Sequence, residues 1–210
     1  MANAINLGAI GALGHSRGGE SVIVQAALDN RIKVILAMGA ENSTDAMANS
    51  TYVNVPAMLI FGSEDSSAPL NDNVNYYNNF NASKEYLQIN GADHDLGIWN
   101  GTAYGFPYNQ TTTPTTEKYV LSWFNYYLYA NSTAINVFNG SSLTSDVSAG
   151  VISKYAVSLR QNLQLTGATT FPQLTIAVTS TSASMTVFGA FLYVNSVRTL
   201  RTKIPKQLKS

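Results

Sequence analysis

A short glycine-rich run near the start of the chain holds the residue best suited to nucleophilic chemistry. Ser16 lies within the sequence GHSRGG at residues 14–19, which contains the pattern Gly-x-Ser-x-Gly. The apolar residues 7–13 before it are typical of a buried strand, and residues 20–28 after it are typical of a helix. The glycines allow strand and helix to approach closely, and the helix N-terminus favours developing negative charge. The pattern therefore predicts an exposed nucleophilic serine on a strand-to-helix turn, called the serine turn below.

A carboxylate and a histidine follow this serine at the ends of two later apolar segments. Residues 56–62 are expected to form a buried strand that runs into an acidic turn containing Asp65. Residues 85–90 are expected to form another strand, which His94 follows. A serine needs a histidine to take its proton, and the histidine needs a carboxylate that fixes its tautomer. Ser16, Asp65 and His94 thus form the expected triad, in the chain order of the α/β-hydrolases.

Other residues compete for the roles of acid and base. Glu64 and Asp72 are alternatives to Asp65 as the acid, although Glu64 also fits a solvated turn residue. His15 is the other histidine of the chain, and its place inside the serine turn leaves His94 as the expected base.

Residues next to the histidine receive lesser roles. Asp93 and Asp95 are too close to His94 in sequence to orient its ring, so we expect them to be solvated or to raise its pKa. Trp99 and His15 are candidates for substrate contact, with packing as the alternative. One histidine between two acids, without any cysteine, is weak spacing for a metal site, and we expect no metal.

These motifs resemble those of the chlorophyllase, dienelactone hydrolase and polyester hydrolase group of α/β-hydrolases. The run GHSRGG at residues 14–19 looks like the serine turn of that group. LIFGSEDSSAP at residues 59–69 resembles its strand and acid turn, including an Asp-x-x-Ala-Pro run that favours Asp65. GADHDLGIWN at residues 91–100 looks like its histidine loop, and residues 115–131 look like its C-terminal helix.

The resemblance implies a serine hydrolase that cleaves a carboxylic ester through an acyl-enzyme, without a cofactor. It makes Ser16 the nucleophile, Asp65 the acid, His94 the base and the backbone N–H of Arg17 half of the oxyanion hole. The second donor normally comes from elements before the serine turn and is expected to be absent from this chain. The alternatives are a serine peptidase of the same fold and an inactive truncated hydrolase acting as a surface or interaction domain.

The expected fold class is α/β, the C-terminal half of an α/β-hydrolase fold with about four parallel strands and flanking helices. The strands are expected at residues 7–13, 32–38, 57–61 and 85–87. The group's earlier strands are missing, so the hydrolase domain is expected to be N-terminally incomplete. The strand at residues 7–13 then becomes an exposed sheet edge, unless the chain's own C-terminal segment covers it.

Charge divides the chain into unlike parts. Residues 1–146 hold all twelve acidic and five basic residues, a net charge of −7, whereas residues 147–210 have a net charge of +7. We expect a hydrolase domain at residues 1–140, a linker or small Ser/Thr-rich extension at 141–173, and an apolar segment with a basic tail at 174–210.

The C-terminal segment and the composition bear on location and partners. Residues 174–197 are long enough for a membrane span, and the basic tail after them would place the C-terminus in the cytoplasm. A pair of strands is the alternative for this segment. Asn-x-Ser/Thr sequons favour an extracellular or cell-surface location. The chain lacks phosphate loops, dinucleotide motifs and basic aromatic patches, so the expected partner is a small or polymeric ester and not nucleic acid.

Overall fold

Strands and helices alternate along the first part of the chain, as expected of a parallel sheet. The structure is a computed structural model that describes residues 6–98, 111–160, 177–178, 185–186 and 191–194. The alternating elements are β1 (Ile10–His15), α1 (Arg17–Leu28), β2 (Ile32–Met38), α2 (Thr44–Ser50), β3 (Ala57–Gly62), α3 (Leu70–Asn79) and β4 (Lys84–Ile89). They are followed by α4 (Thr112–Tyr129), the 3-10 turn η1 (Ser132–Ala134), α5 (Ile135–Asn139), α6 (Ser141–Ser148) and β5 (Ile152–Ser158). The last described elements are β6 (Ala177–Val178), β7 (Met185–Thr186) and β8 (Phe191–Val194).

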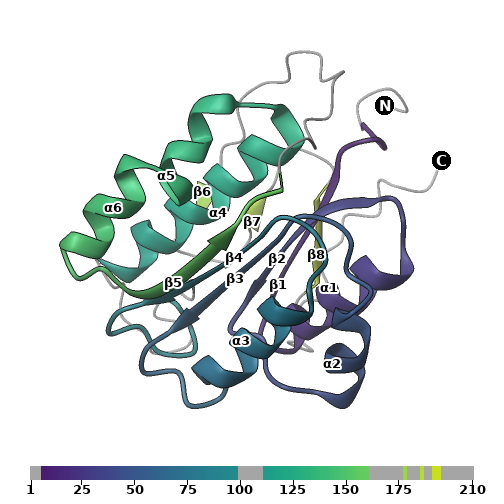
Figure 1. The fold of residues 1–210 in the computed structure, drawn as a ribbon, viewed down its shortest axis with the longest axis horizontal. Helices are drawn as coiled ribbons and strands as arrows, with labels where there is room; N and C mark the ends of the chain where they lie inside the picture. Colours follow the sequence, from purple (N-terminus) through teal and green to yellow (C-terminus); the bar gives the residue numbers. More distant parts are fainter. Residues whose placement is uncertain (1–5, 99–110, 161–176, 179–184, 187–190, 195–210) are drawn as a thin grey trace.

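One mixed sheet lies between two layers of helices (Figure 1). Its strand order is β5-β4-β3-β2-β1-β8, and β6 pairs with β7 separately. Strands β1 to β4 and β8 run parallel, whereas β5 is antiparallel to β4. Helices α1, α2 and α3 cover one face, and α4, α5 and α6 cover the other. Because both faces are covered, β3 is buried along its whole length, which explains its continuous apolar sequence.

Each face of the sheet has its own apolar core. Neighbouring residues of β2 point to opposite faces, so Ile35 packs with the core under α1 to α3 and Leu36 with the core under α4. The fully buried Trp123 of α4 also donates a hydrogen bond from its indole N–H to the carbonyl oxygen of Ile35, at 3.0 Å. This bond fixes α4 over the centre of the sheet.

The α/β fold class is confirmed, with additions at the edge next to β4. For residues 141–173, where a linker or small Ser/Thr-rich extension is expected, the structure describes residues 141–160, which contain α6 and β5, and β5 pairs with β4. Leu143 and Ile152 are buried in the core under α4, so α6 and β5 pack with the preceding elements. The sequence did not suggest β5 because Ser153, Lys154 and Tyr155 are exposed one after another, so the strand lacks the alternation of a half-buried strand.

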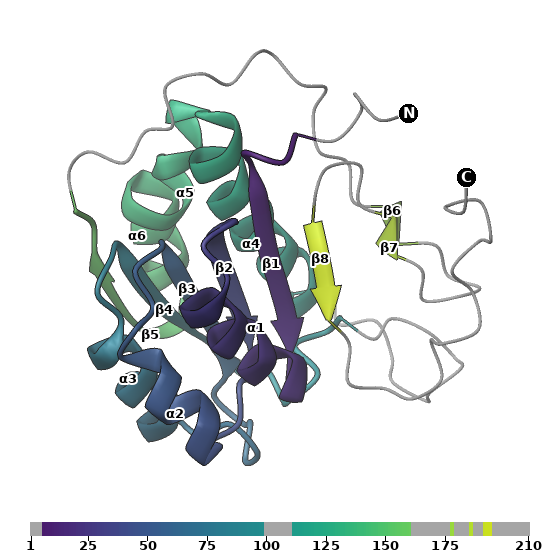
Figure 2. The same cartoon turned by 90° about the vertical axis from the view of Figure 1, so that its right-hand side faces the viewer.

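A second addition lies at the opposite edge of the sheet. Strand β8 pairs in parallel with β1, from Gly11 opposite Phe191 to Gly14 opposite Val194 (Figure 2). The edge expected to be exposed is therefore paired along this stretch. The expected membrane segment at residues 174–197 lacks support, because its described parts are the strands β6, β7 and β8, and its remainder lies outside the described residues. Within the described part of the chain, no helix has the length and apolarity to cross a membrane.

Candidate active site

Ser16 lies on a strained turn between β1 and α1. Its backbone has φ 57° and ψ −124°, a conformation rarely adopted by residues other than glycine. A Cβ atom on Gly14 would lie 2.0 Å from the carbonyl oxygen of Gly18, so glycine is required where strand and helix meet. The N–H of Ser16 donates to the carbonyl oxygen of Met38 at 2.8 Å, which ties the serine turn to the end of β2.

The structure brings Ser16, His94 and Asp65 together in one hydrogen-bonded series. The Oγ atom of Ser16 lies 2.9 Å from Nε2 of His94. Nδ1 of the same ring lies 3.0 Å from each carboxylate oxygen of Asp65. The Asp65 side chain is completely buried, and the N–H groups of Ser67 and Ala68 each donate to its Oδ1 at 2.9 Å.

The charges around this series favour an imidazolium paired with a carboxylate. Burial opposes ionisation of Asp65, but the hydrogen bond from His94 and those from two backbone N–H groups leave its pKa below the ordinary value. The pKa of His94 is raised, chiefly by its hydrogen bond to Asp65 and further by the charges of Asp65, Glu41 and Asp95. A histidine in this setting can accept a proton from a serine and hold it while a reaction proceeds.

The loop after β2 passes beside the histidine and the acid. Gly39 has φ 50°, and a Cβ atom there would lie 3.3 Å from both Nδ1 of His94 and Oδ2 of Asp65. Its N–H donates to the carbonyl oxygen of Ile60 at 2.8 Å, so the loop is held against β3. Glycine at this position thus allows the left-handed backbone conformation and leaves room for the imidazole–carboxylate pair.

The same loop places a carboxylate next to the serine. Oε1 of Glu41 lies 3.2 Å from Oγ of Ser16 and 3.9 Å from Nε2 of His94. Glu41 is not among the residues that the sequence motifs predict for the site, because no recognisable motif includes it. A usable signal was its place just after β2, the neighbour of β1, since loops at the carboxyl ends of adjacent parallel strands converge.

His15, inside the serine turn, holds the histidine loop by a hydrogen bond. It is buried, and its Nε2–H donates to the carbonyl oxygen of His94 at 2.6 Å. Burial is the main cause that lowers the pKa of His15, which keeps the ring neutral. The substrate contact suggested for His15 is replaced by this contact within the protein, and Trp99, the other candidate, lies outside the described residues.

The remaining candidates from the sequence lie around this series without joining it. Asp72 accepts a hydrogen bond from the side-chain amide of Asn42 at 3.1 Å, and Glu64 is exposed. Asp93 accepts from the N–H of Asp95 at 3.1 Å. Across the described ranges, no three His, Cys, Asp or Glu side chains gather as a metal site would require.

Arg17 begins α1 directly after the serine. The first N–H groups of a helix have no acceptor inside that helix, which favours an anionic oxygen near this end of α1. The Arg17 side chain is exposed.

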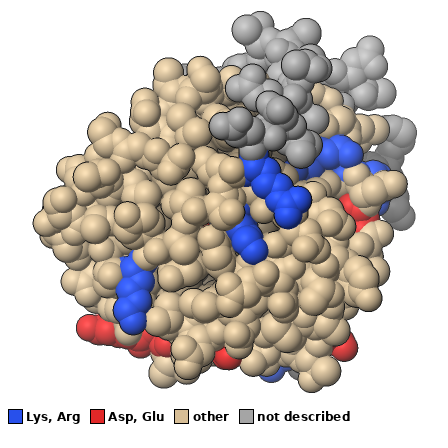
Figure 3. All heavy atoms as spheres, viewed as in Figure 1, with Lys and Arg blue, Asp and Glu red and all other residues tan. Residues whose placement is uncertain are grey.

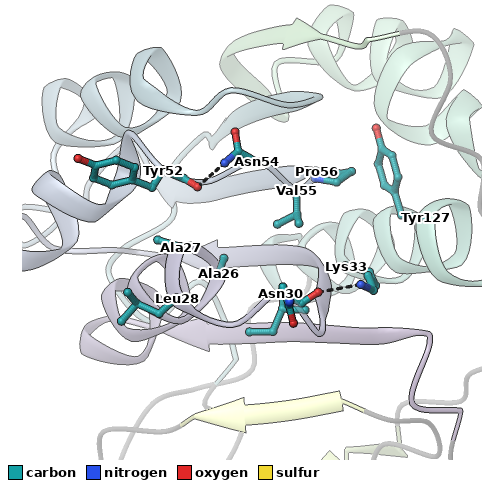
Figure 4. Close-up of a pocket in the computed structure, with 11 residues that line it drawn as sticks. Ala26, Ala27, Leu28, Asn30, Lys33, Tyr52, Asn54, Val55, Pro56 and Tyr127 are labelled. Atoms are coloured by element: carbon teal, nitrogen blue, oxygen red, sulfur yellow. Dashed lines mark hydrogen bonds between the residues drawn. The ribbon is translucent and has the colours of Figure 1, made fainter.

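A cavity of about 370 Å³ lies at the other end of the sheet (Figure 4). It is lined by the end of α1, Asn30, the start of β2, Tyr52, residues 54–56 and Tyr127. Lys33 at its edge donates to the carbonyl oxygen of Asn30 at 2.7 Å. Apart from Tyr127 of α4, these residues lie before or at the start of β2 and before β3. The serine, acid and histidine instead follow the carboxyl ends of their strands, where open α/β sheets bind ligands.

Comparison with known proteins agrees with the motifs. A family model described as PETase, PET hydrolase-like, matches residues 1–156, most of the 210-residue chain. The matched region contains the serine turn, the acid turn, the histidine loop and α4 to α6. A search of curated proteins found no match. The family match confirms the resemblance to the polyester hydrolase group.

Proposed function

Because the chain belongs to the PET hydrolase-like family, we propose that it hydrolyses carboxylic esters with Ser16 as nucleophile, His94 as general base and Asp65 as its orienting acid. The observation that carries the proposal is the continuous series of hydrogen bonds from Oγ of Ser16 through the His94 ring to a buried carboxylate. This series supplies both requirements of a serine nucleophile, a nearby base and a group that fixes the tautomer of the base.

Acylation follows from this arrangement. As Ser16 Oγ attacks the ester carbonyl carbon, Nε2 of His94 takes its proton, and Asp65 stabilises the imidazolium at Nδ1. The Arg17 N–H donates to the oxyanion of the tetrahedral intermediate. His94 then gives its proton to the leaving alkoxide oxygen, the C–O bond breaks, and an acyl-Ser16 ester and a free alcohol result.

Deacylation repeats these steps with water as the nucleophile. Nε2 of His94 removes a proton from water as the hydroxide oxygen attacks the acyl carbon, and the oxyanion again faces the Arg17 N–H. Collapse of the intermediate breaks the bond to Ser16 Oγ, which recovers its proton from His94. The carboxylic acid product leaves, and the histidine is neutral again.

The surface agrees with an uncharged substrate. Only 11% of the residues are charged, and most of the face shown in Figure 3 carries neither acidic nor basic side chains. A small or polymeric ester, which is neutral along its length, meets little electrostatic opposition on such a surface.

The proposal is tested with a fluorophosphonate probe and a neutral p-nitrophenyl ester. We expect the protein to be labelled and to hydrolyse the ester, and Ser16→Ala to abolish both while the circular dichroism spectrum is unchanged. Ser21→Ala is the matched control, because this hydroxyl lies on α1 and donates to the Arg17 carbonyl oxygen at 2.8 Å. Equal labelling of Ser16→Ala and the unchanged protein would reject the nucleophile. Faster cleavage of the corresponding amide than of the ester would favour a peptidase.

A further inference from the structure

We propose that Glu41 is a specificity-determining residue that directs this site toward neutral and cationic esters and away from anionic ones. The inference rests on the proposed function and adds to it a chemical class of substrate. It is carried by the position of the Glu41 carboxylate, which contacts the proposed nucleophile directly, at 3.2 Å from Ser16 Oγ.

The backbone that carries Glu41 is held in place from two sides. Tyr76 of α3 donates its hydroxyl to the Glu41 carbonyl oxygen at 2.7 Å. Two residues earlier, the loop is tied to β3 through the N–H of Gly39, and the intervening Ala40 is fully buried. The backbone from which the carboxylate extends toward Ser16 is therefore held against both α3 and β3.

The Glu41 side chain also faces solvent. It is 33% exposed, and the side chain of His94 is 26% exposed. A substrate must approach Ser16 Oγ from the open side, so an acyl group bonded to this oxygen lies in the immediate neighbourhood of the Glu41 carboxylate. A charged group a few bonds from the ester carbonyl then interacts with Glu41 at short range.

The charge of Glu41 is not neutralised by a lysine or arginine in the part of the chain that the structure describes. Its ion pair there is with His94, at 3.9 Å between Oε1 and Nε2, and that histidine must become neutral to act as a base. Charges about 5 Å apart near a protein surface interact strongly enough to change a rate constant roughly tenfold, even after allowance for solvent screening. Glu41 therefore attracts a cationic substrate and repels an anionic one.

The test uses three p-nitrophenyl esters of the same length. One carries γ-trimethylammoniobutyrate, the second its neutral analogue with carbon in place of nitrogen, and the third γ-sulfobutyrate. For the unchanged protein we expect kcat/KM to fall in the order cationic, neutral, anionic. Glu41→Gln keeps the size of the side chain, and we expect it to reduce the cationic-to-anionic ratio roughly tenfold. High salt should reduce the ratio of the unchanged protein as well.

Asp45→Asn is the matched control, because it removes one negative charge from an exposed position in the first turn of α2. This variant should keep the ratio of the unchanged protein. The inference is overturned if Glu41→Gln leaves the cationic-to-anionic ratio unaltered, or if Asp45→Asn reduces the ratio as much as Glu41→Gln does. In either case, turnover of the neutral ester still upholds the proposed function. Failure of the unchanged protein to hydrolyse even the neutral ester overturns the proposed function and this inference with it.

Discussion

His15 donates a hydrogen bond from Nε2 to the backbone carbonyl oxygen of His94, across 2.6 Å. The residue before the proposed nucleophile thereby holds the loop that carries the proposed base. The two imidazole rings also pack together, with centroids 4.9 Å apart. Since the position of the His94 ring depends on the position of its loop, we expect His15 to influence catalysis without touching the substrate.

Replacing His15 by phenylalanine tests this positioning role. The variant keeps a ring of similar size but leaves the His94 carbonyl oxygen without its donor. A buried acceptor without a hydrogen bond costs about 1–3 kcal/mol of free energy. We expect kcat to fall by about tenfold or more, with little change in KM, because the substrate is not contacted. Steady-state kinetics provide the measurement. His15→Gln, which retains an N–H donor, should lose less, and an equal loss in both variants would point to packing alone.

Asp65→Asn tests the identity of the acid. An asparagine side chain can present an N–H to Nδ1, which favours the wrong histidine tautomer and removes the charge that stabilises the imidazolium. We expect kcat to fall about 10³- to 10⁴-fold. Glu64→Gln is the control, because this substitution removes the same charge from the exposed residue next to Asp65. The reverse ranking of the two variants would transfer the role to Glu64.

The pH dependence of turnover should report the charges around His94. Its pKa is raised, first by the hydrogen bond to Asp65 and then by the charges of Asp65, Glu41 and Asp95, against the effect of burial. His94 acts as a base only when neutral, so activity is lost as pH falls through this pKa. Glu41→Gln removes one source of imidazolium stabilisation and should move the acid limb of the kcat/KM profile to lower pH.

The profile is measured with the neutral ester, so that substrate charge does not contribute. Asp45→Asn should leave the acid limb where it is, because Asp45 has no contact with His94 among the described interactions. A limb that moves to higher pH in Glu41→Gln would contradict the arrangement in which Ser16 and His94 both face this carboxylate.

That Ser16, Asp65 and His94 lie together could be predicted because each follows strong local signals. The glycines at 14, 18 and 19 favour a tight turn at Ser16, and the apolar strands β3 and β4 end at Gly62 and Ile89, shortly before Asp65 and His94. The chain order serine, aspartate, histidine then restricted the fold to that of the α/β-hydrolases. Strand β2 begins and ends where its apolar run does, at Ile32–Met38.

Other parts of the site depend on contacts between distant segments. Glu41 contacts Ser16 because Gly39 adopts a positive φ and Tyr76 holds the loop, and neither feature is visible as a motif. Likewise, β5 and β8 join the sheet by backbone pairing with β4 and β1, which their own sequences do not specify. Pairing partners far apart in sequence are selected by the assembled sheet, so local patterns do not reveal them.

A buried acid outside the site provides a further pH effect. Glu85 of β4 is completely buried, and within the described residues neither of its carboxylate oxygens has a hydrogen-bond partner. Burial raises the pKa of Glu85 well above its ordinary value of 4.5. Its contribution to stability is therefore fully present below that ordinary value, where folded and unfolded chains are both protonated, and is lost as pH rises through the folded-state pKa.

Glu85→Gln should remove this dependence, because the amide has nearly the same shape and carries no charge at any of these pH values. We expect the free energy of unfolding of the variant, relative to that of the unchanged protein, to increase by more than about 1 kcal/mol between about pH 5 and pH 8. Urea unfolding at several pH values measures it. Glu117→Gln is the control, because it removes a carboxylate from a partly exposed position of α4. A difference that is constant or decreases with pH would show that Glu85 is ionised in the folded protein.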